Sequence, residues 1–313
     1  MKEINVAKEI FKEKKSNYVF SHYTSCEALK SIVTNSSLRF TNCMFLNDIE
    51  EYNYIFDFIK STFSDKDDDI SKFIYDITKS LYDEDFDADM GEVVDNNSDY
   101  YLGPKDDGMP RRKAKKGEYY VLSGSIVEDS LPMWVYYSHA GDYLGYSIKL
   151  DVRNIINEVR KNAGEVLYGR VIYDNEKKTS IIRNKAEELF RKYDLPNIEN
   201  DAIDSLQEEY YEFIQNIRLF FKRDGFKNEQ EFRIVMLVDR GELDSSGYYI
   251  SKGIIKPYIE LKFSDGVPIC GIMMSPSIEE KLGAAGLKVM LNDQNRVNYS
   301  GIDIRKSSLR LRY

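Results

Sequence analysis

The sequence predicts an α+β protein built on a central sheet of mixed or antiparallel strands. Strand and helix patterns alternate irregularly, and the last third is mostly β, with apolar runs at 231–238, 255–263 and 270–274. This order favours α+β over the regular alternation that a parallel sheet requires. With 313 residues, of which 42% are hydrophobic, the chain can bury a sizeable core. We interpret residues 1–313 as one domain.

Two segments interrupt the predicted sheet. Residues 83–117 are acidic and then rich in glycine, proline and lysine, which is typical of a long loop or an inserted lid. Residues 177–222 carry two long helical patterns with broad polar faces, which predict a helical insertion beside the sheet. Near the end of the chain, the pattern predicts a helix over 277–285 and a strand over 287–291.

Charge and composition exclude several classes of protein. The net charge of −9 argues against a protein that coats nucleic acid through bulk charge, although the basic cluster at 111–116 could hold a phosphate-bearing target instead of being a solvated loop. No apolar run approaches membrane-spanning length, and the charged start of the chain does not resemble a signal peptide, so we expect a cytoplasmic protein. Three scattered cysteines and two histidines lack metal-ligand spacing, so we expect no metal centre.

The first candidate site is a histidine at a strand-to-helix junction. A short apolar run leads to His22, and Ser25 is suited to cap the helix that follows. The amides and positive potential of a helix N-terminus suit phosphate or carboxylate groups. A structural histidine, hydrogen-bonded in a turn, is the other interpretation and the more common one for a lone histidine.

The second candidate is a short helix that begins near Leu131, with Pro132 at a position that proline favours. Trp134 and Tyr137 lie three residues apart and share a helix face. They could stack on a flat ring such as nicotinamide, or they could anchor the helix to the core. We favour the core for Trp134, and both interpretations stay open for Tyr137.

The third candidate is a strand that begins at Glu231. Strand alternation places Glu229, Glu231 and Arg233 on one face. A carboxylate that enters a buried strand is costly unless it is paired or functional. Glu231 therefore either forms a structural bridge with Arg233 or stabilises positive charge during glycosidic chemistry.

Together these motifs resemble a bacterial family of unknown function. The resemblance runs from about Tyr18 to Leu309, and its motifs are His22-Tyr23-Thr24-Ser25, Leu46-Asn47-Asp48, Ser123-x-Ser125, Ser130-Leu131-Pro132-Met133-Trp134 and Glu229-x-Glu231-Phe232-Arg233.

More distantly, the order of the motifs is similar to that of ADP-ribosyltransferases. The resemblance implies an ADP-ribosyltransferase-like sheet, NAD as the substrate, and catalytic roles for His22 and Glu231. His22 would bind a ribose hydroxyl, and Glu231 would orient the nicotinamide ribose and stabilise the cation formed there. Two features depart from the family: no tyrosine lies at 38–41, and Ser-x-Ser normally accompanies an arginine in the first motif.

The remaining residues implied to bind NAD are spread over the same motifs. Tyr23, Tyr137 or Trp134 would stack on the nicotinamide, and the helix capped by Ser25 would lie near the diphosphate. The full set of these residues is Tyr23, Thr24, Ser25, Asn47, Ser123, Ser125, Trp134, Tyr137 and Arg233.

The function implied by this resemblance is an NAD-dependent ADP-ribosyltransferase that modifies a protein or a nucleic acid. Small bacterial proteins of this kind act as toxins or phage-defence effectors, which implies an acceptor and an antitoxin or defence partner. Two alternatives stay open. One is an NAD glycohydrolase, and the other is a non-catalytic module that binds a nucleotide or a partner protein.

Overall fold

The computed structural model describes most of the chain and divides it into two compact units. The described residues are 19–46, 51, 53–81, 101–102, 112–113, 118–137, 144–163, 165–194, 200–238, 246–251, 253–293, 299 and 301–310. The helical unit is drawn from Asp48–Gly117 and Ile172–Asp224, and the sheet unit from Ile10–Asn47, Glu118–Val171 and Gly225–Tyr313. We had expected one domain, and we describe the two units separately.

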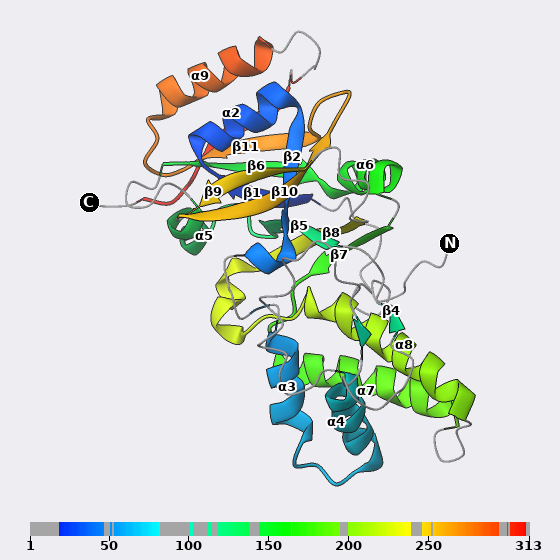
Figure 1. The fold of residues 1–313 in the computed structure, drawn as a ribbon. Helices are drawn as coiled ribbons and strands as arrows, with labels where there is room; N and C mark the ends of the chain where they lie inside the picture. Colours follow the sequence, from blue (N-terminus) through cyan, green and yellow to red (C-terminus); the bar gives the residue numbers. More distant parts are fainter. Residues whose placement is uncertain are drawn as a thin grey trace. The chain divides into compact units, whose positions relative to one another are not determined.

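The sheet unit contains one large mixed sheet, so the predicted α+β class is confirmed (Figure 1). Its pairs are antiparallel except for β11 and β12, which run parallel. The strand order is β12 (Asp303–Lys306), β11 (Ile269–Met274), β6 (Tyr146–Asp151), β1 (Val19–Thr24), β5 (Glu118–Ser125), β2 (Ser37–Asn42), β10 (Ile254–Lys262) and β9 (Ser246–Ser251). Off this path, β8 (Glu231–Val238) pairs with β5, and β7 (Glu165–Arg170) pairs with β8.

Strand β5 is the branch point of the sheet. One edge pairs with β8 along its whole length, whereas the other edge is shared between two strands. Ser125 pairs with Ser21 of β1, and the opposite end of β5 pairs with β2 through Val121 and Tyr120. Since β1 continues along β6 as far as Thr24, β1 and β5 separate after Ser21. We call this separation, flanked by His22 and Ser123, the β1–β5 seam.

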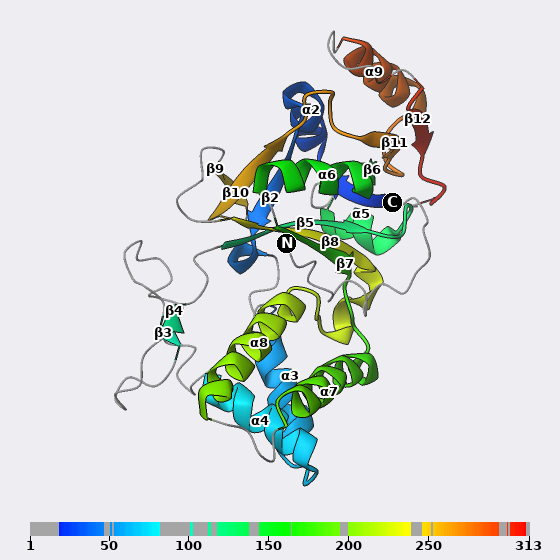
Figure 2. The ribbon, with the colours of Figure 1, turned by 90° about the vertical axis from the view of Figure 1, so that its right-hand side faces the viewer.

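One face of the sheet carries the main core. It includes Phe20, Leu122, Ile148 and Phe232, and it is covered by α2 (Cys26–Asn35), α6 (Val152–Ala163) and α9 (Glu280–Asn292) (Figure 2). Helix α9 is continuous, so the strand predicted over 287–291 is wrong. Leu287 and Leu291 are both buried, and their spacing of four residues is that of one helix face.

The opposite face is covered in part by α5 (Leu131–Tyr137), the helix predicted after Ser130. Trp134 is fully buried there with Met133, Met273 and Tyr23, and the Tyr23 ring meets the Trp134 ring edge-on at 4.8 Å. In this part of the sheet, one face therefore packs against the main core and the other against a smaller cluster around Trp134.

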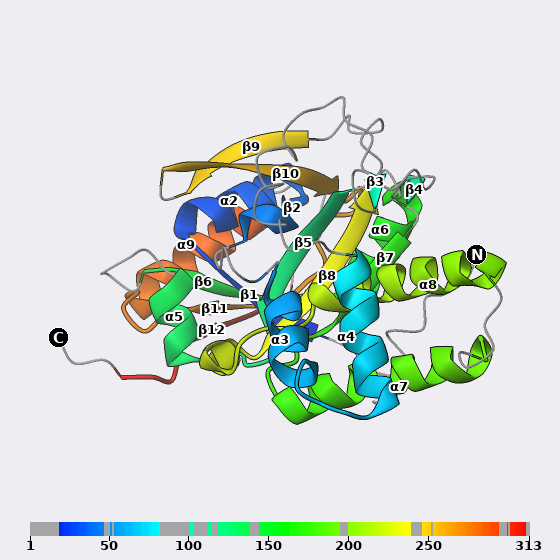
Figure 3. The ribbon, with the colours of Figure 1, turned by 60° about the horizontal axis from the view of Figure 1, so that its bottom comes forward.

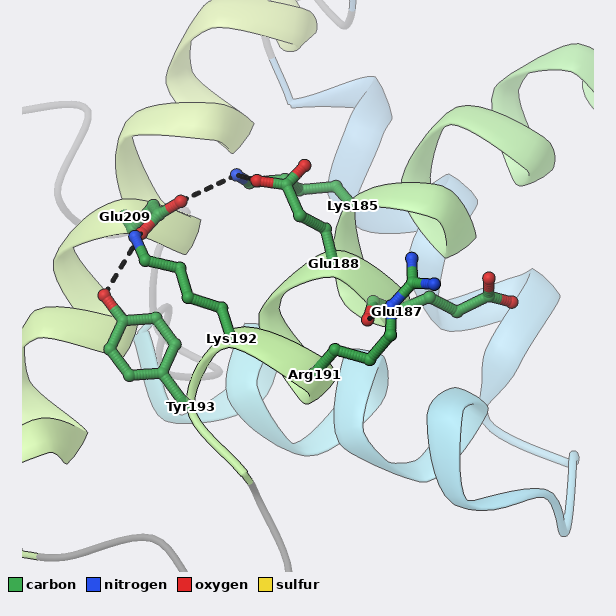
Figure 4. A network of polar contacts seen from close by, with 7 residues as sticks. All are labelled: Lys185, Glu187, Glu188, Arg191, Lys192, Tyr193 and Glu209. Carbon is green, nitrogen blue, oxygen red and sulfur yellow. Dashed lines mark hydrogen bonds and ion pairs between the residues drawn. The ribbon is translucent and has the colours of Figure 1, made fainter.

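The helical unit contains α3 (Tyr54–Phe63), α4 (Asp69–Leu81), α7 (Asn175–Lys192) and α8 (Asn200–Arg218) (Figure 3). The insertion predicted over 177–222 supplies α7 and α8. Glu209 of α8 joins them by accepting hydrogen bonds from Lys185 at 2.8 Å and from Tyr193 at 3.1 Å, and by pairing with Lys192 (Figure 4). Burial opposes ionisation of Glu209, but the bonds from both lysines outweigh it and lower its pKa to about 2.

Little of the expected lid at 83–117 falls within the described residues. Within it, β3 (Tyr101–Leu102) pairs with β4 (Arg112–Lys113) as a separate antiparallel ladder. The rest of that segment, including most of the basic cluster at 111–116, lies outside the described residues. Every helix in the described ranges is too short or too polar to cross a membrane.

Candidate functional site

His22 lies at the seam and bonds across it. Its Nδ1 atom is 2.9 Å from the carbonyl oxygen of Ser123 on β5. A carbonyl oxygen can only accept a hydrogen bond, so Nδ1 carries the proton and donates. Burial lowers the pKa of His22, an effect that this hydrogen bond partly opposes, which favours the neutral ring at physiological pH. The second ring nitrogen, Nε2, is then a hydrogen-bond acceptor.

The helix after His22 begins as predicted. The side chain of Ser25 accepts a hydrogen bond from the backbone N–H of Ala28 at 3.2 Å, and α2 ends at Ser36, which adopts a left-handed φ of 49°. Leu29 and Val33 bury the apolar face of this helix against the main core. Ser25, the N-cap of α2, therefore lies three residues from His22 along the chain.

Polar side chains line the opposite face of β1, β5 and β8. Ser21 pairs with Ser125, which pairs with Glu231, and Ser123 pairs with Arg233. Directly paired residues share a sheet face, so these five side chains lie on one side. Four of them are buried, with exposed fractions of 6% or less, and Ser123 is intermediate. Such a row of buried polar groups is unusual for a sheet core.

Within this row, Glu231 and Arg233 form a two-pronged ion pair. Arg233 donates from Nε and from Nη2 to the two carboxylate oxygens of Glu231, each at 2.8 Å. The residue before the pair, Gln230, has a left-handed φ of 41°, a conformation that costs free energy for a residue other than glycine. Its carbonyl accepts from the N–H of Ile126 at 2.9 Å, which fixes the start of β8 against the end of β5.

The two serines of the Ser-x-Ser motif differ in their bonding. Ser125 donates to the carbonyl of Glu229 at 2.7 Å and accepts from the N–H of Val127 at 3.1 Å, so its hydroxyl is engaged in structure. The hydroxyl oxygen of Ser123 is buried and has no hydrogen-bond partner within the described part of the chain. A buried polar atom without a partner is destabilising, so Ser123 is the more suitable of the two to bind a ligand.

Tyr23 is an anchor for the loop that follows β5. The single proton of its hydroxyl is shared between the carbonyls of Val127 and Glu128, at 3.1 and 2.9 Å, and the hydroxyl oxygen accepts from the N–H of Ser130 at 3.0 Å. The ring is 5% exposed. Tyr23 is therefore poorly placed to stack on nicotinamide, because its ring packs against Trp134 and its hydroxyl is hydrogen-bonded to the loop.

Trp134 is likewise a structural residue. Its ring is 0% exposed, and its Nε1 donates to Asp129 at 2.8 Å, so no ring face is left for a ligand. Tyr137 is half-buried beside it, and its stacking role stays a prediction. Asn47, expected to bind the cofactor, lies outside the described residues.

Strand alternation divides the remaining candidates between the two faces. His22 pairs with Ile148 and Thr24 with Tyr146, which puts both on the side of the main core. Glu231, Arg233 and the two serines lie on the other side. A joint catalytic role for His22 and Glu231 requires both to face one cleft, and the structure instead places the two side chains on opposite faces of the sheet. The seam, where β1 and β5 are no longer paired, is where His22 bonds to the strand that carries Ser123.

Asp129 is a structural residue that the sequence analysis missed. It accepts from Trp134 and from Ser307 and Ser308, at distances of 2.7 to 3.0 Å. Burial opposes the ionised form, but these hydrogen bonds lower the pKa of Asp129. No local pattern marks this role, because two of its three partners are nearly 180 residues away. Among the described residues, no group of three His, Cys, Asp or Glu side chains gathers to hold a metal ion.

The comparison with protein families bears on α5 and β8 in particular. Residues 133–234 match the family model described as a protein of unknown function, DUF2971. The DUF2971 match begins within α5 and ends within β8, and it covers about a third of the chain. The prediction of a domain of unknown function is therefore confirmed, whereas the motifs assigned to it and the likeness to ADP-ribosyltransferases stay predictions. No curated protein and no solved structure matches this chain.

Proposed function

We propose that the sheet unit binds NAD across the β1–β5 seam and transfers its ADP-ribose to an acceptor. The observation that carries this proposal is His22, whose ring is held by the Ser123 carbonyl with Nε2 left as an acceptor for a ribose hydroxyl. Paired strands lie about 4.8 Å apart, so β1 and β8 flank β5 within about 10 Å. That distance is within the length of an extended dinucleotide, but His22 and Glu231 lie on opposite faces of the sheet, so a ligand that contacts both has to pass between β1 and β5 at the seam.

In the proposed reaction, the bond between nicotinamide and C1′ of its ribose breaks, and its electron pair leaves with neutral nicotinamide. The ribose then carries positive charge, which a nearby carboxylate stabilises. A nucleophile on a protein or nucleic acid forms the new bond at C1′ and releases its proton to a base or to water. We assign the stabilising carboxylate to Glu231.

This assignment requires a rearrangement at Glu231. Both of its carboxylate oxygens accept hydrogen bonds from Arg233, so one of them must turn to the ribose for catalysis. Arg233 would keep the other oxygen in place and would balance the charge of the carboxylate. The hydroxyl of Ser123, which has no hydrogen-bond partner among the described residues and lies directly across from Arg233, would bind the same ligand.

The closed Glu231–Arg233 pair also favours a second candidate function. If the pair never opens, Glu231 is structural and the seam is a nucleotide-binding site without catalysis. A glycohydrolase would use the same site with water as the acceptor.

Incubation of the full chain with NAD tests these functions. Free nicotinamide measures bond cleavage, transfer of labelled ADP-ribose to lysate components measures acceptor modification, and calorimetry measures NAD binding. His22→Phe should weaken NAD binding at least about tenfold, and Glu231→Gln should abolish nicotinamide release while binding persists. His139→Phe, the only other histidine of the chain, is the matched control and should leave both unchanged.

The possible results separate the functions. Release with transfer supports the transferase, release without transfer assigns glycohydrolysis, and binding without release assigns the non-catalytic module. A wild-type chain that neither binds NAD nor releases nicotinamide, with or without lysate, overturns the proposal. The toxin or phage-defence role belongs to the same proposal: expression of the active chain should slow growth of a bacterial host, and expression of Glu231→Gln should not.

A further inference from the structure

The hairpin of β9 and β10 carries an exposed apolar face. Tyr248, Ile250 and Ile255 are 72%, 76% and 62% exposed. Ile250 pairs directly with Ile255, and Tyr248 pairs with Pro257, so all four side chains lie on one side of the hairpin. We call these four residues the hairpin face. It continues the core side of the sheet, because Ile259, two residues beyond Pro257 on β10, is buried in the main core.

The hairpin also ends the sheet. β9 is last in the strand order, and within the described ranges it pairs only with β10, at the margin of the sheet (Figure 3). Edge strands of soluble proteins usually carry charges or proline, which prevent pairing with another strand. The sequence of β9, Ser-Gly-Tyr-Tyr-Ile-Ser, contains neither. This edge is therefore chemically suited to accept another strand.

We infer that the edge pairs with the same edge of a second copy of the chain, in an antiparallel contact with two-fold symmetry. The sequence of β9 is complementary to itself in this orientation. When Tyr249 lies opposite its own copy, Tyr248 faces Ile250 of the partner subunit, and both side chains belong to the exposed face. The contact merges two hairpin faces into one apolar surface across the symmetry axis.

Strand β9 carries no charged residue, so two chains that each have a net charge of −9 can approach at this edge without local repulsion between the paired strands.

Sedimentation of the full chain, from about 1 to about 100 µM, tests this inference. The wild-type chain should form a dimer as its concentration rises, and Ile250→Lys should weaken association at least about tenfold by charging the edge. Leu282→Lys is the matched control, because Leu282 on α9 is also 76% exposed, and it should leave association unchanged. A monomer throughout this range, or an equal loss in the control, overturns the inference.

Oxidative cross-linking tests the register separately. With Cys26 and Cys270 replaced by serine, Tyr249→Cys should form a disulfide with its own copy, since the two positions lie directly opposite each other. Tyr136→Cys, at a position that is 60% exposed on α5, should not. Cross-linking through Tyr136→Cys in preference to Tyr249→Cys would contradict the proposed contact. Both results are independent of whether the seam binds NAD.

Discussion

Arg233 holds both carboxylate oxygens of Glu231, two residues before it on the same strand, through hydrogen bonds of 2.8 Å from Nε and Nη2. The two residues are 2% and 6% exposed. Removing charges of this kind from water costs several kcal/mol, and the pair offsets that cost only while both partners are present. Loss of either charge should therefore destabilise the start of β8, whether or not Glu231 takes part in catalysis.

Removal of one partner should be more damaging than removal of both. Arg233→Met leaves a buried carboxylate without its guanidinium, and we expect the free energy of unfolding to fall by about 3–5 kcal/mol. Glu231→Gln keeps an acceptor for Arg233 and should cost less, and the double variant should recover part of the loss. Urea unfolding of all three chains measures these values and their coupling. Additive losses would show that the pair contributes little.

Gly124 is required by the ring packed against it. A Cβ atom at this position would lie 1.9 Å from Cδ2 of Phe20 and 2.9 Å from the carbonyl oxygen of Ser21. Because the second contact is with backbone, the strand itself would have to shift. We expect Gly124→Ala to cost about 2–4 kcal/mol in urea unfolding. Gly225→Ala, where an added Cβ meets nothing within 4 Å, is the control and should change stability little.

The sequence predicted local features of the site because local contacts determine them. Ser25 caps its helix through an N–H three residues away, and alternation along β8 places Glu231 and Arg233 on one face. The helix–strand boundary predicted near 285–287 was wrong for a local reason as well. Burial of Leu287 and Leu291 on one helix face keeps the chain helical through Gly283 and Gly286, although glycine disfavours a helix interior.

The seam could not be predicted, because it depends on which strands share the edges of β5. His22 and Ser123 are 101 residues apart in the sequence. No sequence pattern indicates that β1 and β5 separate after a single residue pair. The role of Tyr23 in anchoring the loop after β5 could not be predicted for the same reason. An aromatic residue before a helix is compatible with stacking on a ligand, whereas its actual hydroxyl partners lie on a loop more than 100 residues later.

The hydroxyl of Tyr23 should stabilise the loop between β5 and α5. Tyr23→Phe removes one acceptor and one donor from buried backbone groups of that loop, and we expect a loss of about 1–3 kcal/mol. Tyr136→Phe, on an exposed tyrosine of α5, should change stability by less than about 0.5 kcal/mol. Hydrogen exchange should show faster exchange of the Ser130 amide in Tyr23→Phe. Unchanged protection there would argue against the anchoring role.

Lys178 should limit the stability of the helical unit at neutral pH. Its side chain is completely buried, and Nζ donates to the Tyr54 hydroxyl at 2.9 Å and to Oδ1 of Asn175 at 3.0 Å. Burial lowers the pKa of Lys178 to about 8, although Asp174 and Asp224 oppose this effect. At pH 7 the folded chain therefore holds a charged amine that its surroundings disfavour.

The sign of the pH dependence follows from the two protonation states. Between pH 8 and the ordinary lysine value of 10.5, the unfolded chain binds more protons at Lys178 than the folded chain does. The free energy of unfolding should therefore rise with pH in this window, by at most about 3 kcal/mol from this residue. Lys178→Met lacks the titration and should be more stable than the wild-type chain at pH 7, by about 1–3 kcal/mol.

Urea unfolding of the wild-type chain and Lys178→Met, from pH 7 to pH 10, measures this effect. The difference in free energy of unfolding between the variant and the wild-type chain should shrink as the pH rises, because burial no longer disfavours Lys178 once it has lost its proton. Taking the difference between the two chains cancels the groups that titrate in the same range and do not contact Lys178. Lys177→Met, at the exposed neighbouring position, is the matched control for the loss of a lysine from this part of α7. A constant difference for Lys178→Met would mean that Lys178 titrates normally in the folded chain.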